Sequence, residues 1–191
     1  MLSRFEPSDA LIIVDLQNDF CPGGALPVPD GDQIVPVVNR LIESAARAGV
    51  PVFASRDWHP PDHISFKTRG GVWPPHCVQG TQGAAFHPGL RLSETAVIIS
   101  KGTEREKEAY SGFEGTDLAG RLRLARRTRL WIGGLAQDYC VKQTVLDARR
   151  LGFEVRLIRS ATRPVDVRPG DGKRALEEMR LAGARIENQI P

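Results

Sequence analysis

The chain has 191 residues, a length that suits one domain with a single buried core, so we expect residues 1–191 to form one domain. Hydrophobic residues make up 41% of the chain and charged residues 26%, which is typical of soluble globular proteins. The net charge of +3 is mild, and no stretch approaches the roughly 20 apolar residues that a membrane span needs, so we expect no membrane partner.

Apolar runs alternate with amphipathic segments along the chain. The apolar runs predict buried strands at 10–16, 50–55, 96–100, 128–133, 154–158 and 184–187. Apolar residues at helical spacing predict helices at 32–49, which Asp32 would cap, at 138–151, which Asp138 would cap, and at 171–182. Strands that alternate with helices indicate βαβ units. We therefore predict an α/β fold of three layers, with a six-stranded, mostly parallel sheet between two layers of helices.

Five arginines gather between residues 121 and 129, within the sequence GRLRLARRTRL. Segments that bind nucleic acid interleave such charges with aromatic residues or turn motifs. Here the arginines flank leucines, which favours a solvated helix face followed by a loop. We expect no nucleic-acid partner.

Two long segments, 56–93 and 101–115, interrupt the alternation. Long loops inside a compact α/β domain are usually functional, and ligands bind beyond the carboxyl ends of the strands. Asp15, Asp57 and Lys101 lie at or just past such ends, as does the turn 136–140. We expect these positions to converge at one edge of the sheet.

All four histidines of the chain fall between positions 59 and 87. Asp57 and His59 stand two residues apart just after a predicted strand, and His76 returns from a loop that two prolines stiffen. Imidazoles and a carboxylate suit zinc, iron or manganese, so the cluster predicts a metal site. The spacing of His63 allows either a fourth ligand or a partner of a ligand. His87, beside a proline, is interpreted as structural.

Cys140 lies where the fourth predicted strand turns into a helix. A thiol in the first turn of a helix gains thiolate character from the helix dipole, and free N–H groups there can bind an oxyanion. A cysteine considered alone is more often a small buried apolar residue. Asp15 and Lys101 at neighbouring strand ends supply a base and a cation, which favours a nucleophile instead.

The other two cysteines, Cys21 and Cys77, are interpreted as lining or bystander residues. Three cysteines are an odd and sparse set, which indicates reduced thiols rather than a disulfide scaffold. The first residues lack the shape of a signal peptide. We therefore expect a cytoplasmic protein.

Five segments, in this order and at these intervals, resemble the nicotinamidases of the isochorismatase-like cysteine hydrolase family. The segments are ALIIVDLQNDFCPGGAL, SRDWHPPDHISF, WPPHCVQGT, SKGTEREKEAYSGFEGT and GGLAQDYCVKQTVLDA. The resemblance covers nearly the whole chain and implies a Rossmann-like, isochorismatase-type fold. It also implies hydrolysis of nicotinamide to nicotinate and ammonia, and of pyrazinamide, through a thioester, by an enzyme that forms homo-oligomers.

The resemblance implies a role for each candidate residue. The catalytic triad would be Asp15, Lys101 and Cys140. In it, Asp15 would take the thiol proton and Lys101 would lower the thiol pKa. The ligands of one divalent ion, zinc before iron or manganese, would be Asp57, His59 and His76, with His63 as an addition in some relatives. The slot for a flat ring would be formed by Phe20, Trp73, Tyr139 and Leu135. A cis peptide at 135–136 would aim the N–H groups of Ala136 and Cys140 at the oxyanion.

Two other functions stay open at the level of the sequence. Ureido and carbamoyl amidases of the same family keep the triad but generally lack the metal ligands, so the histidines favour nicotinamide as the substrate. A non-catalytic binding protein on the same scaffold would tolerate the loss of at least one triad residue, whereas all three are intact.

Overall fold

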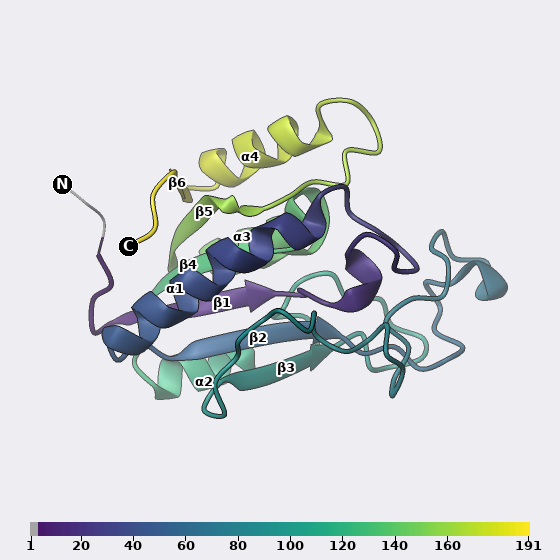
Figure 1. The fold of residues 1–191 in the computed structure, drawn as a ribbon, viewed down its shortest axis with the longest axis horizontal. Helices are drawn as coiled ribbons and strands as arrows, with labels where there is room; N and C mark the ends of the chain where they lie inside the picture. The colour runs from purple at the N-terminus through teal and green to yellow at the C-terminus, as the bar shows by residue number, and fades with distance from the viewer. Residues whose placement is uncertain (1–3) are drawn as a thin grey trace.

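The structure, a computed structural model, describes residues 4–191. In this part of the chain six strands form one sheet, and they are β1 (Asp9–Val14), β2 (Val52–Asp57), β3 (Val97–Lys101), β4 (Arg129–Gly134), β5 (Glu154–Thr162) and β6 (Arg185–Glu187). The strand order is β3-β2-β1-β4-β5-β6, and each neighbouring pair is parallel (Figure 1). The predicted parallel sheet is confirmed.

Helices cover both faces of the sheet. α1 (Val35–Arg47) packs on one face, in front of the sheet in Figure 1, and the opposite face carries α2 (Leu118–Leu124), α3 (Lys142–Arg150) and α4 (Asp171–Leu181). Successive strand residues point to opposite faces. Leu11 and Ile13 of β1 therefore pack with α1, whereas Ala10 and Ile12 pack with the other helices. Because both faces are covered, β1 is buried along its whole length, as parallel strands are in such folds.

α1 begins later than the sequence predicts. Asp32 lies inside a short 3-10 turn, η2 (Gly31–Ile34), and its side chain caps no helix. The N-cap position of α1 belongs to Ile34 instead. The prediction that Asp32 caps this helix is wrong because the extra turn displaces the start of the α-helix toward its C-terminal end.

Asp138 does not cap a helix either. It lies within a π-helical turn, η4 (Gln137–Val141), which precedes α3. Its carboxylate accepts hydrogen bonds from the backbone N–H groups of Val165 and Asp166, both at 2.9 Å. The capping rule considers only adjacent residues, whereas these donors lie in the connection between β5 and α4.

Both long segments predicted as functional loops are largely irregular. The connection from β2 to β3 contains one turn of 3-10 helix, η3 (Lys67–Arg69), and both connections extend beyond the carboxyl end of the sheet (Figure 1). Between residues 4 and 191, no helix has the length and apolar character needed to cross a bilayer.

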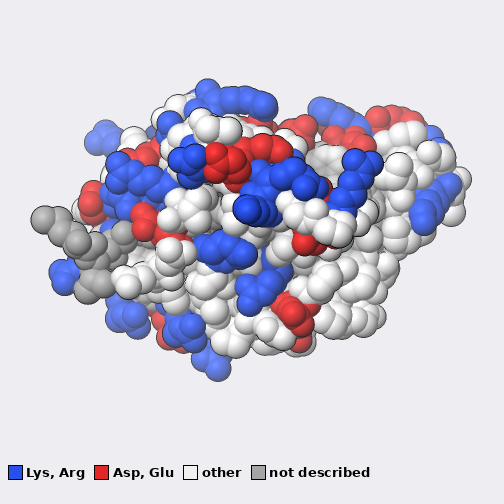
Figure 2. All heavy atoms as spheres, turned by 90° about the horizontal axis from the view of Figure 1, so that it is seen from above, with Lys and Arg blue, Asp and Glu red and all other residues white. Residues whose placement is uncertain are grey.

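Seen from above the view of Figure 1, basic and acidic side chains are interleaved over the surface (Figure 2). On α4, Arg174 pairs with Asp171 and Arg180 with Glu177.

Candidate active site

Four segments of the chain meet at the carboxyl edge of the sheet, where the strand order reverses between β1 and β4. Such a reversal opens a crevice, because the connections after the two strands leave in opposite directions. Asp15 directly follows β1, Asp57 and Lys101 end β2 and β3, and Cys140 lies in η4 after β4. Three atoms lie within 4.8 Å of one another: a carboxylate oxygen of Asp15, a carboxylate oxygen of Asp57 and the sulfur of Cys140. The predicted convergence of these strand ends is confirmed.

β1 and β4 approach each other closely at this edge. Gly134, the last residue of β4, has a φ of +129°, and a Cβ atom there would lie 2.0 Å from the Val14 carbonyl oxygen. Only glycine permits this approach. Asp15 has a φ of 47°, and the chain turns so that the Gln17 N–H donates to the Asp15 carbonyl oxygen at 2.8 Å. The Asp15 side chain is thereby fully buried beneath the crevice.

Lys101 is the centre of the site. Its Nζ atom lies 2.9 Å from Asp15 Oδ2 and 3.5 Å from Cys140 Sγ, and it donates a very short hydrogen bond to Asp57 Oδ1. Lys101 and Asp57 are directly paired across β2 and β3, so the register of the sheet places their side chains together. Burial alone would lower the pKa of Lys101, but the two carboxylates hold it well above its usual value. The lysine is therefore a permanent buried cation.

The two carboxylates respond differently to this cation. Burial raises the pKa of Asp15, and Lys101 and the Ser55 hydroxyl, which donates to Asp15 Oδ1 at 2.7 Å, offset only part of that rise. Burial acts on Asp57 in the same direction, but the positive charge of Lys101 is the largest opposing effect, and the pKa of Asp57 lies below its usual value. Asp15 is thus the more basic carboxylate, and Asp57 stays ionised.

Cys140 is buried in the π-helical turn that follows a cis peptide bond between Leu135 and Ala136. The predicted cis peptide is confirmed. Among the described residues, the backbone N–H of Ala136 donates to no acceptor, so it is available to a ligand. Burial raises the pKa of the Cys140 thiol well above its usual value, and Asp15 and Asp57 add to the rise while Lys101 opposes it. Lys101 therefore lowers the thiol pKa, as the resemblance implies, but burial and the two carboxylates outweigh its effect.

Asp57, His59 and His76 form a group whose ligand atoms lie within 4.8 Å of one another. The Nε2 atoms of His59 and His76 lie 3.5 and 3.9 Å from Asp57 Oδ2. The Nδ1 atoms lie 2.9 Å from the Gly102 carbonyl oxygen and 2.8 Å from that of Pro74. Because a carbonyl only accepts, the Nδ1 atoms carry the protons and the Nε2 lone pairs face the carboxylate. Burial lowers the pKa of His76, which favours its neutral, ligating form. This donor set fits a divalent metal ion.

His63 lies behind this group. Its Nε2 lies 3.0 Å from the Lys107 carbonyl oxygen, and its Nδ1 lies 2.7 Å from the Ser65 hydroxyl, so both ring nitrogens are already paired. Its ring stacks on that of His59, with centroids 4.2 Å apart. Of the two roles that the sequence allows, the geometry supports a partner of a ligand. His87 lies away from the group, and its Nδ1 accepts a bond from the Gly89 N–H.

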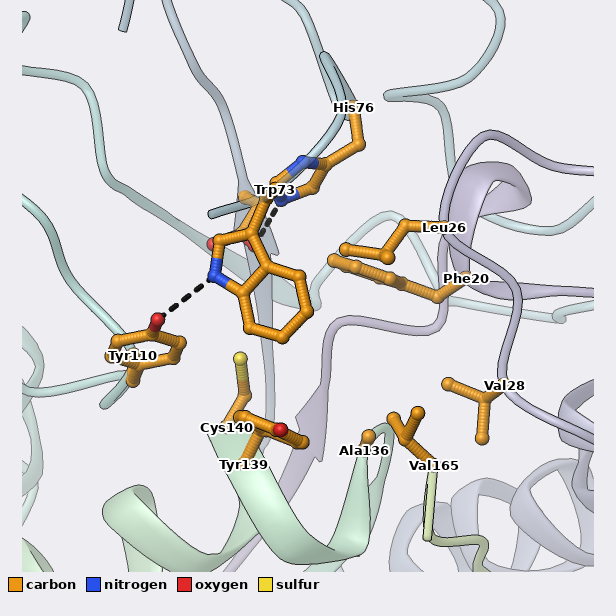
Figure 3. A pocket seen from close by; sticks show the side chains of 11 residues that line it. Phe20, Leu26, Val28, Trp73, His76, Tyr110, Ala136, Tyr139, Cys140 and Val165 are labelled. Atoms are coloured by element: carbon orange, nitrogen blue, oxygen red, sulfur yellow. Dashed lines mark hydrogen bonds and ion pairs between the residues drawn. The ribbon is translucent and has the colours of Figure 1, made fainter. Parts of the chain in front are cut away.

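A mainly apolar pocket leads down to Cys140 (Figure 3). Three of the aromatic residues expected from the sequence line it, namely Phe20, Trp73 and Tyr139. Trp73 and Tyr139 meet edge to face, with ring centroids 5.3 Å apart. Leu135, also expected in the slot, does not line the pocket. Its N–H continues the ladder to the Val14 carbonyl oxygen and its side chain is fully buried in the core on the α1 side.

Several residues that build the site escaped the sequence analysis. Tyr110, Val165, Leu26 and Val28 line the pocket, but they lie in connections and belong to no periodic pattern. The Gln17 side chain donates to the Asp57 carbonyl oxygen and accepts from the Asp57 N–H, both at 2.8 Å. Nothing in the sequence around Gln17 indicates that its side chain pairs with the backbone of Asp57, 40 residues away.

Comparisons with known proteins agree with this geometry. A family model described as the isochorismatase domain matches residues 9–189. The chain is 43% identical to a nicotinamidase of Escherichia coli, over 94% of each protein. It is similar to the pyrazinamidase of Pyrococcus horikoshii in complex with zinc, with 55% identity and a TM-score of 0.92, covering 96% of this chain and 100% of that one. PnC1 from L. infantum in complex with nicotinate shares 35% identity and a TM-score of 0.89, covering 98% of this chain and 96% of the other.

Proposed function

The chain belongs to the isochorismatase family, and from that premise we propose that it is a nicotinamidase that also accepts pyrazinamide. The observation that carries the proposal is the position of Cys140, whose sulfur lies 3.5 Å from the Nζ of Lys101 at the base of an aromatic pocket. Lys101 in turn contacts Asp15. A nucleophile, a proton acceptor and a buried cation thus meet where a flat amide can enter.

The pocket explains the preference for an aromatic amide. Phe20, Trp73 and Tyr139 offer ring faces and edges, and Val28 and Val165 add apolar surface. A pyridine or pyrazine ring would stack or pack edge-on against these walls and lose contact with water. Ureido and carbamoyl compounds without such a ring would leave these apolar walls without a contact partner.

Asp57, His59 and His76 would hold one divalent ion, for which we propose zinc. The protons on both Nδ1 atoms, and a carboxylate that stays ionised, suit this role. When bound, the ion supplies a Lewis-acid position at the edge of the pocket that suits a ring nitrogen or a water molecule. The zinc in the P. horikoshii relative supports the choice of metal.

In the acylation step, the Cys140 sulfur attacks the carboxamide carbon while its proton passes to Asp15, whose pKa burial raises. The new S–C bond leaves negative charge on the amide oxygen, which the N–H groups of Ala136 and Cys140 would receive. Protonated Asp15 then delivers its proton to the amide nitrogen, the C–N bond breaks, and ammonia leaves a thioester on Cys140. Lys101 keeps the net charge of the site balanced throughout.

The second half of the reaction restores the enzyme. Asp15 takes a proton from a water molecule whose oxygen attacks the thioester carbon. The S–C bond breaks and the sulfur regains its proton from Asp15. The product is released as nicotinic acid, which gives its carboxyl proton to water and becomes nicotinate. Both half-reactions use Asp15 and Cys140. The S–C bond that forms in the first half breaks in the second, and the proton that sulfur gives to Asp15 is replaced.

Ammonia release from a panel of nicotinamide, pyrazinamide, ureidoacrylate and N-carbamoyl compounds tests the substrate. We expect turnover of the two aromatic amides and a loss of roughly 1,000-fold or more in the Cys140→Ala variant. Preferred turnover of a ureido or carbamoyl compound would refute the substrate. Near-normal turnover by the alanine variant would refute the nucleophile.

Removal of the metal tests the proposed ligands. We expect a demonstrably metal-free protein to lose activity and to regain it when one equivalent of Zn²⁺ per chain is added back. Full activity in the metal-free state would refute the role of Asp57, His59 and His76.

We further propose that residues 1–191 work as one domain, in the cytoplasm, as a homo-oligomer. The three thiols Cys21, Cys77 and Cys140 are all free, as expected for a reducing compartment. Light scattering coupled to gel filtration measures the oligomeric state, and cell fractionation measures the location.

A further inference from the structure

The outer wall of the pocket contains three hydrogen-bonded side chains that the reaction described above does not use. Trp73 Nε1 donates to the Tyr110 hydroxyl oxygen at 2.9 Å, a bond drawn in Figure 3. The Tyr110 hydroxyl donates to Glu108 Oε1 at 2.7 Å. Trp73 and Tyr110 line the pocket, whereas Glu108 lies outside it on an exposed segment.

The direction of these two bonds is fixed by chemistry. An indole N–H can only donate, and an ionised carboxylate can only accept. The single proton of the Tyr110 hydroxyl must therefore point at Glu108, and its lone pair must face Trp73. Burial raises the pKa of Tyr110, so the hydroxyl keeps the proton that this arrangement needs. With both bonds made, Tyr110 holds Trp73 in one orientation.

The backbone on either side of Glu108 is attached to the catalytic and metal groups. The Lys107 carbonyl oxygen pairs with His63 Nε2 at 3.0 Å, and the Ala109 carbonyl oxygen accepts from Lys101 Nζ at 3.4 Å. Glu108 is thus an exposed residue on a fixed segment. Glu108 also lines a small cavity together with Trp73, His59 and His76.

We propose that Glu108 is a positioning residue that, through Tyr110, fixes the Trp73 wall and so determines how tightly the aromatic amide binds. Trp73 forms one side of the ring slot and meets Tyr139 edge to face at 82°. A rotated indole would lose this contact and open the slot. The effect on substrate rests on the proposed function, but the two hydrogen bonds that link Glu108 to Trp73 through Tyr110 do not.

The indole N–H resonances of the free protein test the bond itself. The chain has three tryptophans, and Trp73→Phe identifies the signal of Trp73 by its loss. We expect Glu108→Ala to move the Trp73 signal and to leave that of Trp131, whose Nε1 donates to Asp9 at 2.8 Å, unchanged. Glu108→Gln should retain most of the wild-type position, because its amide oxygen still accepts from Tyr110.

Steady-state kinetics test the consequence for nicotinamide. We expect Glu108→Ala and Tyr110→Phe to raise KM roughly two- to tenfold, the worth of one hydrogen bond, while kcat stays within about twofold. Glu106→Ala is the matched control, because Glu106 lies on the same exposed segment but pairs with Arg69 at 2.9 Å. It should change neither the Trp73 signal nor KM.

An unmoved Trp73 signal in Glu108→Ala would overturn the proposal, as would a shift of equal size in Glu106→Ala. A moved signal with an unchanged KM would overturn the specificity role. If wild type fails to hydrolyse nicotinamide, the proposed function fails, while the resonance shift still decides whether Glu108 positions Trp73.

Discussion

The strand ends and the connecting loops contribute different parts of this active site. Asp15, Asp57 and Lys101 stand at strand ends, and each is at most 4% exposed. Trp73 and Tyr110 come from the two long connections and are half-buried. The first set surrounds the proposed nucleophile and includes one of the proposed metal ligands, Asp57. The second set forms the walls around the substrate.

The two sets are held by different forces. The ladder between β2 and β3 pairs Asp57 with Lys101 directly, and the Asp15 N–H donates to the Ser55 carbonyl oxygen at 3.1 Å. In the pocket walls, individual hydrogen bonds between side chains determine where each side chain lies. One example is the hydrogen bond from Trp73 to Tyr110. Changes at the strand ends should therefore affect chemistry and stability together, whereas changes in the walls should affect binding alone.

The largest effect is expected for Lys101→Met. Removing the cation leaves the buried carboxylates of Asp15 and Asp57 without the positive charge that Lys101 Nζ, in contact with both, supplies. We expect turnover to fall roughly 1,000-fold and the free energy of unfolding to fall by about 3–5 kcal/mol. Ammonia release and urea denaturation followed by circular dichroism measure the two losses.

Lys107→Met is the matched control for that change. Its side chain is 58% exposed, and its Nζ lies 3.4 Å from Glu104, whose side chain is 65% exposed. Such a surface pair contributes at most about 1 kcal/mol. A Lys101→Met protein that keeps a tenth of its activity would contradict the idea that chemistry and stability share this residue.

A smaller effect is expected for Gly102→Ala, which tests how the strand end supports the metal ligands. Gly102 has a φ of +60°, and a Cβ atom there would lie 2.4 Å from Cε1 of the His59 ring. Because the ring would have to move, we expect the affinity of the metal-free protein for Zn²⁺ to fall roughly 10–100-fold. Competition with a chromophoric chelator measures this affinity.

Gly115→Ala separates the contact with His59 from the cost of the backbone conformation. Gly115 also has a positive φ, +65°, but the nearest atoms to its Cβ would be 3.9 Å away, at the ends of two flexible side chains. It should lose stability, as any alanine does at such a φ, yet bind Zn²⁺ normally. Equal losses of affinity in the two variants would rule out the steric explanation.

The same division decides what the sequence could predict. Apolar runs that alternate with amphipathic segments predicted the six strands. The rule that ligands bind beyond the carboxyl ends of strands predicted that Asp15, Asp57 and Lys101 converge. The clustered histidines, His76 among them, predicted a metal site, whereas the exact set of ligands and the aromatic slot depended on family resemblance. Tyr110 and Val165 were missed because no local pattern says which loop residue turns back toward the crevice.

The capping predictions failed for a related reason. Asp138 has the residue type and position of an N-cap, but its carboxylate bonds to Val165 and Asp166, 27 and 28 residues further on. Tertiary hydrogen bonds outweighed the local preference. Asp138 thereby fixes the segment that brings Val165 to the pocket, a role that only the folded chain reveals.

The smallest effect is expected for Val165→Ala, a change confined to the wall. Val165 lines the pocket, and its backbone bond to Asp138 survives the substitution. Loss of two methyl groups from a half-buried contact should raise the KM for nicotinamide roughly three- to tenfold, with kcat and the unfolding free energy little changed. Val167→Ala is the control, because that side chain is 63% exposed and outside the pocket. If kcat fell as far as KM rose, the walls would take part in the chemistry, and the separation between strand ends and loops would not hold.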